Sequence, residues 1–242
     1  MTLAWISATR SAALDVAFGL ARTTALCAPL CLASCAVMES PATAPAGPAR
    51  FQLLSQEQMT PAQRELANNI RSGPRAAVPG SAANSAALGS PFNVFLRSPE
   101  LGDHLQKVGS YIRFKSTMGA RLNEFAILIT ARQWNAQYEW HAHHRLALQA
   151  GLSPEVAAAV AAGQRPTGMK PDEEIVYNFC QELHTQKRVS DASYKAVVDQ
   201  FGEQGVMDLI AVNGYYVLVA MVLNVDRTPI PNGGELPLKA LK

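Results

Sequence analysis

Long runs of like charge are absent from this chain of 242 residues, and charged residues make up only 17% of it. The formal net charge is +2, and no segment concentrates lysine and arginine. The sequence therefore lacks the basic surface that binds nucleic-acid phosphates, and we expect no nucleic-acid partner. The apolar content of 48% is that of a globular protein and excludes a largely disordered chain.

Alternating strand-like patterns are also scarce, so a β-sheet is not expected. Segments rich in alanine and leucine, with apolar residues at helical spacing, dominate instead and predict an all-α fold. A hydroxyl residue followed by proline is typical of a helix start, and this pair occurs at Thr60 and again at Ser98. The second of these helices should run to about Phe114 and place Leu101, Leu105, Val108 and Ile112 on one apolar face.

Cysteine is nearly missing from the body of the chain. Cys27, Cys31 and Cys35 lie near the N-terminus and Cys180 stands alone further on, so there is no disulfide framework. The uncharged residues 23–34 are too few to span a membrane and are typical of the core of a signal peptide. The run Leu-Ala-Ser-Cys that ends at Cys35 resembles the lipobox, in which the cysteine becomes lipidated.

These features predict four parts. Residues 1–35 are expected to be a signal peptide of the lipoprotein type with Cys35 as the lipidation site, and residues 36–50 a Pro/Ala-rich tether. A helical domain should follow over 51–228, with a tail over 229–242. The protein is then exported, either periplasmic or membrane-anchored as a lipoprotein; plain secretion and a cytoplasmic chain with a misassigned start are the alternatives.

The stretch 205–225 is nearly all apolar and long enough to cross a membrane. Asp208, Asn213 and two tyrosines interrupt it, which favours a buried helix or a subunit interface. We therefore expect membrane contact only through the lipid anchor.

The chemistry-bearing residues gather between 121 and 151. Glu124 lies in one apolar helical run, and a second helix, with Asn135 as its expected N-cap, ends near Gly151. That second helix carries three of the five histidines of the chain within residues 141–144. Glu139 and His143 are four residues apart and share a helix face, so they are expected to form a hydrogen-bonded acid–base pair.

The chain resembles the carboxymuconolactone decarboxylase and alkylhydroperoxidase-D superfamily over residues 51–225. The resemblance lies in PFN at 91–93, SPELG at 98–102, Glu124, the helix from Glu139 to His143, GLS at 151–153 and GYY at 214–216. In the peroxidase branch of that superfamily a CxxC pair precedes the histidine. Ala136 and Glu139 occupy those two positions here, so neither can supply a thiol.

The resemblance implies an alkylhydroperoxidase-D-like helical bundle that forms homo-oligomers. It also implies a cofactor-free carboxy-lyase of the decarboxylase branch, acting on a small carboxylated lactone or a related ring-derived acid. Glu124, Glu139 and His143 are the expected catalytic residues, and no cofactor or metal is expected. The rival functions are a non-catalytic binding or assembly protein on the same scaffold and, despite the missing CxxC, a peroxidase.

Simpler interpretations of the same residues stay open. Glu139 and His143 are alternatively a surface pair, and Glu124 a structural acid that pairs with Arg121 or Arg132. His141 and His144 are expected at a rim or an interface. Together with Glu139 and His143 they are chemically fit as metal ligands, but their spacing does not place all four on one helix face.

Five residues are expected to bind the substrate, either as aromatic and polar walls of the pocket or as a cation for its carboxylate. They are Phe92, Asn93, Arg97, Trp134 and Trp140. Arg121 and Arg132 are further candidates for the cation. The Gly/Pro/Ser/Ala-rich loop 72–90 is long for a compact domain, so it is expected either to cover a site or to be mobile.

Overall fold

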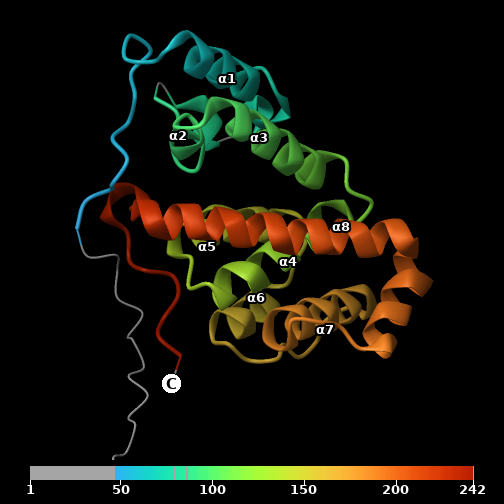
Figure 1. The fold of residues 1–242 in the computed structure, drawn as a ribbon. Coiled ribbons are helices and arrows are strands. Elements are labelled where there is room, and N and C mark those ends of the chain that lie inside the picture. Colours follow the sequence, from blue (N-terminus) through green and yellow to red (C-terminus); the bar gives the residue numbers. More distant parts are fainter. Residues whose placement is uncertain (1–46, 79, 86, 242) are drawn as a thin grey trace, which may run out of the picture. The chain divides into compact units, whose positions relative to one another are not determined.

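The computed structural model describes residues 47–78, 80–85 and 87–241 (Figure 1). The expected signal peptide, Cys35 and most of the tether lie outside these residues, so they stay predictions. Every regular element in the described part of the chain is helical, which confirms the all-α prediction. The α-helices are α1 (Pro61–Arg71), α2 (Phe92–Phe95), α3 (Pro99–Phe114), α4 (Gly119–Gln133), α5 (Gln137–Gln149), α6 (Pro154–Ala161), α7 (Pro171–Gln186) and α8 (Asp191–Asp226). Three short 3₁₀ helices are η1 (Pro74–Ala77), η2 (Ala82–Asn84) and η3 (Pro231–Gly233).

The helix ends follow local chemistry. The Thr60 hydroxyl accepts a hydrogen bond from the Gln63 amide, whose side chain accepts one from the Thr60 amide, and this capping box starts α1. Gly151, at φ 94°, follows the C-cap of α5 in the position that favours glycine. Asn135 was wrongly expected to be the N-cap of α5. It has a left-handed backbone at φ 47° and turns the chain between α4 and α5, while Ala136 holds the cap position.

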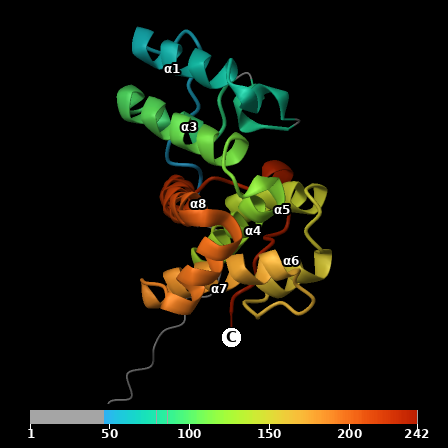
Figure 2. The same ribbon diagram turned by 90° about the vertical axis from the view of Figure 1, so that its right-hand side faces the viewer.

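The core is built around α4 and α8. Residues 122–132 of α4 are all buried, because α5, α6, α7 and α8 pack around this helix. Figures 1 and 2 show α8 running between α3 on one side and α4 and α5 on the other. A non-helical Gly202, at φ 69°, divides α8 into a short first part and the long apolar part.

Of the described helices, only α8 is long and apolar enough to cross a membrane, and 56% of its most apolar window is buried in the domain. Its position among four other helices accounts for its apolar composition, as in the core helix of a globular protein.

A second, smaller cluster joins α1, α2 and the start of α3. Leu66, Ile70, Phe92 and Phe95 lie at its centre. The expected apolar face of α3 is partly wrong, because Leu101 and Val108 are 55% and 45% exposed. Ile112 is buried and Leu105 packs against the core, as expected. The other buried residues of α3 are Gly102, Gln106 and Gly109, and the two glycines allow neighbouring elements to approach closely.

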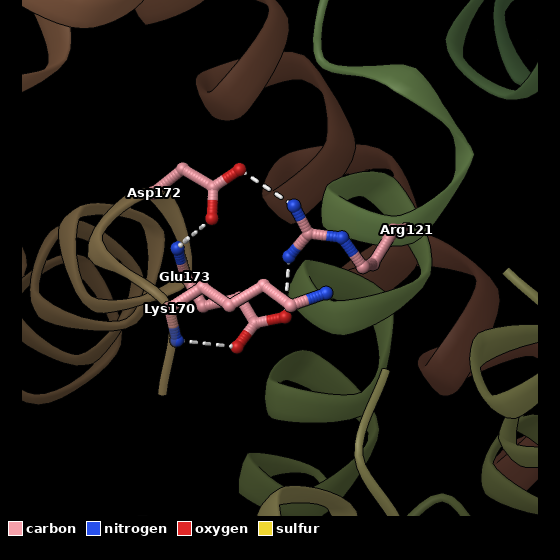
Figure 3. A network of polar contacts seen from close by, with 4 residues as sticks. All are labelled: Arg121, Lys170, Asp172 and Glu173. Atoms are coloured by element: carbon pink, nitrogen blue, oxygen red, sulfur yellow. Dashed lines mark hydrogen bonds and ion pairs between the residues drawn. The ribbon is translucent and has the colours of Figure 1, made fainter. Parts of the chain in front are cut away.

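An ion-pair network joins α4 to the start of α7 (Figure 3). Arg121 contacts the carboxylates of both Asp172, at 2.6 Å, and Glu173. Glu173 also accepts a hydrogen bond from the Lys170 amide, at 2.8 Å. The network supplies anionic groups at the N-terminus of α7, where the helix dipole favours them.

The tail packs on the helices. The Gln137 side chain exchanges two hydrogen bonds with the backbone of Leu238, at 2.8 and 2.9 Å, and Leu238 is buried. At the other end of the domain, the Arg50 amide donates to the Asp226 carbonyl at 2.8 Å, and the Phe51 amide donates to the Asp226 carboxylate at 3.0 Å. Both ends of the described chain are therefore tied to the helical domain.

Candidate active site

A cavity of about 260 Å³ opens between α5, α8, the end of α3 and the segment 75–92. Its wall combines apolar side chains with convergent polar ones, which is the usual make-up of a small-molecule site. The lining residues include Arg75, Pro91, Phe92, Arg113, Tyr138, Glu139, His141, His143, Arg145, Leu146, Tyr215, Tyr216, Val219 and Leu223. Of the two alternatives for the loop 72–90, the structure shows the first, because residues of this loop form part of the wall.

Glu124 contacts His143, which is one of the residues of the cavity wall. The antiparallel packing of α4 on α5 brings the His143 Nδ1 to 2.6 Å from the Glu124 Oε2. Their side chains are only 12% and 9% exposed. A carboxylate that accepts a hydrogen bond from Nδ1–H holds the imidazole in one orientation and leaves its Nε2 as the nitrogen that can exchange a proton. The ring of Tyr216 holds the imidazole edge-on, with centroids 5.0 Å apart.

The predicted hydrogen bond between Glu139 and His143 is wrong, because the imidazole binds Glu124 instead. Glu139 nevertheless lines the same cavity. It is 1% exposed, and neither carboxyl oxygen has a hydrogen-bond partner among the described residues. This burial raises the pKa of Glu139 well above its ordinary value of 4.5, because desolvation disfavours the charged carboxylate.

Two tyrosines complete the inner wall. Tyr215 and Tyr216 pack edge-on against each other, with ring centroids 5.3 Å apart. Burial, opposed by Arg75 and Arg113, raises the pKa of Tyr215 to about 12, and burial raises that of Tyr216 well above its usual range. Both phenols therefore keep their protons and serve as hydrogen-bond donors.

The arginines of the cavity are not those expected from the sequence. Arg113 and Arg75 lie in its wall, and the Arg113 Nη2 is 3.7 Å from the Glu124 carboxylate. Burial, reinforced by the like charge of Arg113 and opposed by the tyrosines, lowers the pKa of Arg75, which still remains charged at neutral pH.

The three arginines predicted to bind a carboxylate lie elsewhere. Arg97 contacts the Gln52 carbonyl, and Arg132 donates to the Lys239 carbonyl at 2.9 Å. Arg121 belongs to the network of Figure 3. Glu124 therefore pairs with neither Arg121 nor Arg132, the two partners suggested for it as a structural acid.

Of the other residues predicted to form the cavity wall, some line the cavity and others do not. Phe92 lines the cavity, whereas Asn93, Trp134 and Trp140 do not. The side-chain Nδ2 of Asn93 donates hydrogen bonds to the backbone carbonyls of Phe51, at 3.1 Å, and Gln52, at 3.3 Å. Trp140 is buried in the core and stacks on His144, with ring centroids 5.8 Å apart, and Trp134 packs against the same core.

A metal or thiol site does not form in this wall from the described residues. His141 lies in the wall and His144 does not, and no group of three or more histidines, cysteines or carboxylates is arranged around one point. Cys180, on α7, is buried against α8, and its Sγ lies 3.2 Å from the side-chain Nδ2 of Asn213. Burial raises the pKa of the Cys180 thiol to about 12.

Arg75 and Arg113 were not among the site residues predicted from the sequence, although the position of Arg75 in the chain is unusual. Arg75 is the only charged residue between 72 and 90, in a loop otherwise made of small and apolar residues and one asparagine. A lone charge in such a loop indicates a specific contact. Arg113 offered no comparable signal, because it lies on a helix that also carries other charges.

Comparisons of the chain with protein-family models, with curated proteins and with solved structures find no match.

Proposed function

We propose that the protein is a cofactor-free carboxy-lyase of the carboxymuconolactone decarboxylase family, with the alkylhydroperoxidase-D-like bundle and a homo-oligomeric state. Its substrate is a small carboxylated lactone or a related ring-derived acid. One observation carries the proposal: His143, which is paired with Glu124, and the buried Glu139 line the same small cavity. Groups whose environments separate their protonation states in this way are typical of acid–base catalysis.

The reaction requires one proton. The bond between the ring carbon and its carboxylate breaks, CO₂ leaves, and the electron pair moves through the ring double bond onto the lactone carbonyl oxygen. Glu139 gives its proton to carbon, and His143 returns a proton from solvent to Glu139. The Tyr215 and Tyr216 phenols are the donors available to the oxygen on which charge develops.

Burial suits Glu139 to this role. A carboxyl group at its ordinary pKa would be ionised at neutral pH and could give no proton. The apolar wall keeps this one protonated, because desolvation disfavours the carboxylate. Glu124 stabilises the imidazolium that forms when His143 carries a proton, since the two side chains are in direct contact.

The test is to incubate the protein with 4-carboxymuconolactone and to measure product formation by NMR. Glu139→Gln and His143→Ala are each expected to lower kcat by about 10²–10⁴-fold, the usual contribution of a general acid or base. His144→Ala is the matched control, because His144 lies on the same helix and does not line the cavity. Unchanged turnover in Glu139→Gln and His143→Ala would refute the assignment.

The rival function is a binding protein on the same scaffold. It predicts that the wild type binds the lactone without converting it. The two functions are separated when the same NMR samples are followed both for ligand line broadening and for product.

A further inference from the structure

Arg75 is a buried cation without an anionic partner. Its residue surface is 3% exposed, and it forms no ion pair or hydrogen bond with the described residues. Its guanidinium lies over the ring of Phe92, 5.4 Å from the centroid. A buried charge of this kind is costly unless a partner arrives, and such a group in a cavity wall indicates a ligand of opposite sign.

Arg113 is the second cation of the same wall. Its contact with Glu124 is long, at 3.7 Å, and its buried Nε has no hydrogen-bond partner in the described part of the chain. Arg113 is close enough to Arg75 for the two like charges to interact. Folding therefore holds two guanidinium groups together, which is unfavourable until an anion lies against them.

Tyr215 lies beside these two groups. A β-carbon added at Gly109 would touch both the Tyr215 hydroxyl and the Arg75 Nη2, the latter at 2.7 Å, so these two atoms are neighbours. Gly109 leaves the space that both side chains occupy. The protonated phenol adds a neutral donor to the two charged ones.

Two cations and one buried carboxyl group lie in this wall. Arg75 and Arg113 line the cavity, and Glu139, the carboxyl residue among its described lining residues, is buried so that its charged form is disfavoured. The same wall also carries apolar side chains, among them Phe92, over which the Arg75 guanidinium lies, Val219 and Leu223. A ligand that fits both features has an apolar body and one anionic end.

We infer that Arg75 and Arg113, with the Tyr215 hydroxyl beside them, form a subsite that holds a carboxylate of a small cyclic acid. Guanidinium groups bind carboxylate oxygens through paired charge-assisted hydrogen bonds, which explains the choice of arginine here. The assignment of this acid as a substrate rests on the proposed function, whereas binding of its carboxylate does not require turnover.

The test uses benzoate and benzamide as probes, since they share a shape and differ in charge. Isothermal titration calorimetry on the full chain should show benzoate binding more tightly than benzamide. Arg75→Met should weaken benzoate binding by about 10- to 100-fold, the range for loss of a hydrogen bond to a charged group, and leave benzamide binding unchanged. Arg165→Met is the control, because Arg165 also stacks on an aromatic ring, at 5.2 Å from Tyr177, but lies outside the cavity.

Three results would overturn the inference: no benzoate binding at millimolar concentration, equal affinity for the two probes, or unchanged benzoate affinity in Arg75→Met. Displacement of benzoate by inorganic phosphate at equal or lower concentration would also overturn it, by assigning the subsite to phosphate. Turnover in the NMR assay that survives Arg75→Met would defeat this inference and leave the proposed function intact.

Thermal unfolding separates binding from a structural role. Arg75→Met should unfold at the same temperature as the wild type or higher, because it removes an unpaired buried charge. Benzoate should raise the melting temperature of the wild type and not that of the variant. A clear loss of stability in Arg75→Met, with benzoate still protective, would show that Arg75 is structural.

Discussion

Glu139 should make the stability of the folded protein fall as pH rises. Folding favours the protonated form of this carboxyl group, because the side chain is 1% exposed, its oxygens lack hydrogen-bond partners among the described residues, and burial raises its pKa. In the unfolded chain the same group ionises near its ordinary pKa of 4.5. Replacement by glutamine keeps the shape of the protonated acid and removes the titration.

The direction follows from proton counting. Above pH 4.5 the folded state holds one more proton at Glu139 than the unfolded state, so the free energy of unfolding decreases with pH. The limiting slope is about 1.4 kcal/mol per pH unit. While Glu139 stays protonated in the folded state, the loss between pH 5 and pH 7 amounts to about 2–3 kcal/mol. For a domain of this size that corresponds to a shift in melting temperature of about 5–10 °C.

The assay is urea unfolding of wild type and Glu139→Gln at a series of pH values from 5 to 8. The difference between the two proteins cancels every other titrating group, and it should grow with pH in favour of the variant. Glu203→Gln removes an exposed carboxylate from α8 and is the matched control for the change in charge. A Glu139→Gln difference that stays flat over this range would mean that Glu139 is ionised in the folded state, and the acid role proposed for it would be lost.

Two further predictions concern the frame around the cavity. Arg121→Ala should destabilise the fold by about 3–5 kcal/mol, because it leaves the buried Glu173 carboxylate without its cation, and urea unfolding measures the loss. An effect below about 1 kcal/mol would show that the network of Figure 3 behaves as an exposed ion pair. Cys180 should resist alkylation in the native protein at pH 8 and react after unfolding, because burial raises its pKa to about 12, and peptide mass mapping reads this out. Alkylation of the native thiol at the rate of the unfolded chain would contradict the buried position.

Local chemistry made the helices predictable. The helix start at Thr60 and the helix end at Gly151 both depend on residues close together in the chain. Hydroxyl caps and left-handed glycines act within one helical turn, so their positions can be read without knowledge of the rest of the fold. The same holds for the all-α class, since apolar residues at helical spacing appear in every long segment.

Contacts between helices could not be predicted from local sequence. The spacing of Glu139 and His143 shows that they share a helix face, but the approach of α4 gives His143 to Glu124 instead. Spacing along one helix carries no information on the angle and register at which another helix packs against it. The apolar residues of α3 were misplaced for the same reason, because its glycines, rather than Leu101 and Val108, allow close packing.

The segment 121–151 contains all three proposed acid–base residues, because Glu124, Glu139 and His143 lie within one helical hairpin. The cations of the cavity come from residues far from this hairpin in the chain, Arg75 in the loop before α2 and Arg113 at the end of α3. Burial is what changes the chemistry of these groups, and it arises only when distant segments exclude water together. Local sequence therefore specifies which groups are present, and the packing of the helices sets their protonation and their partners.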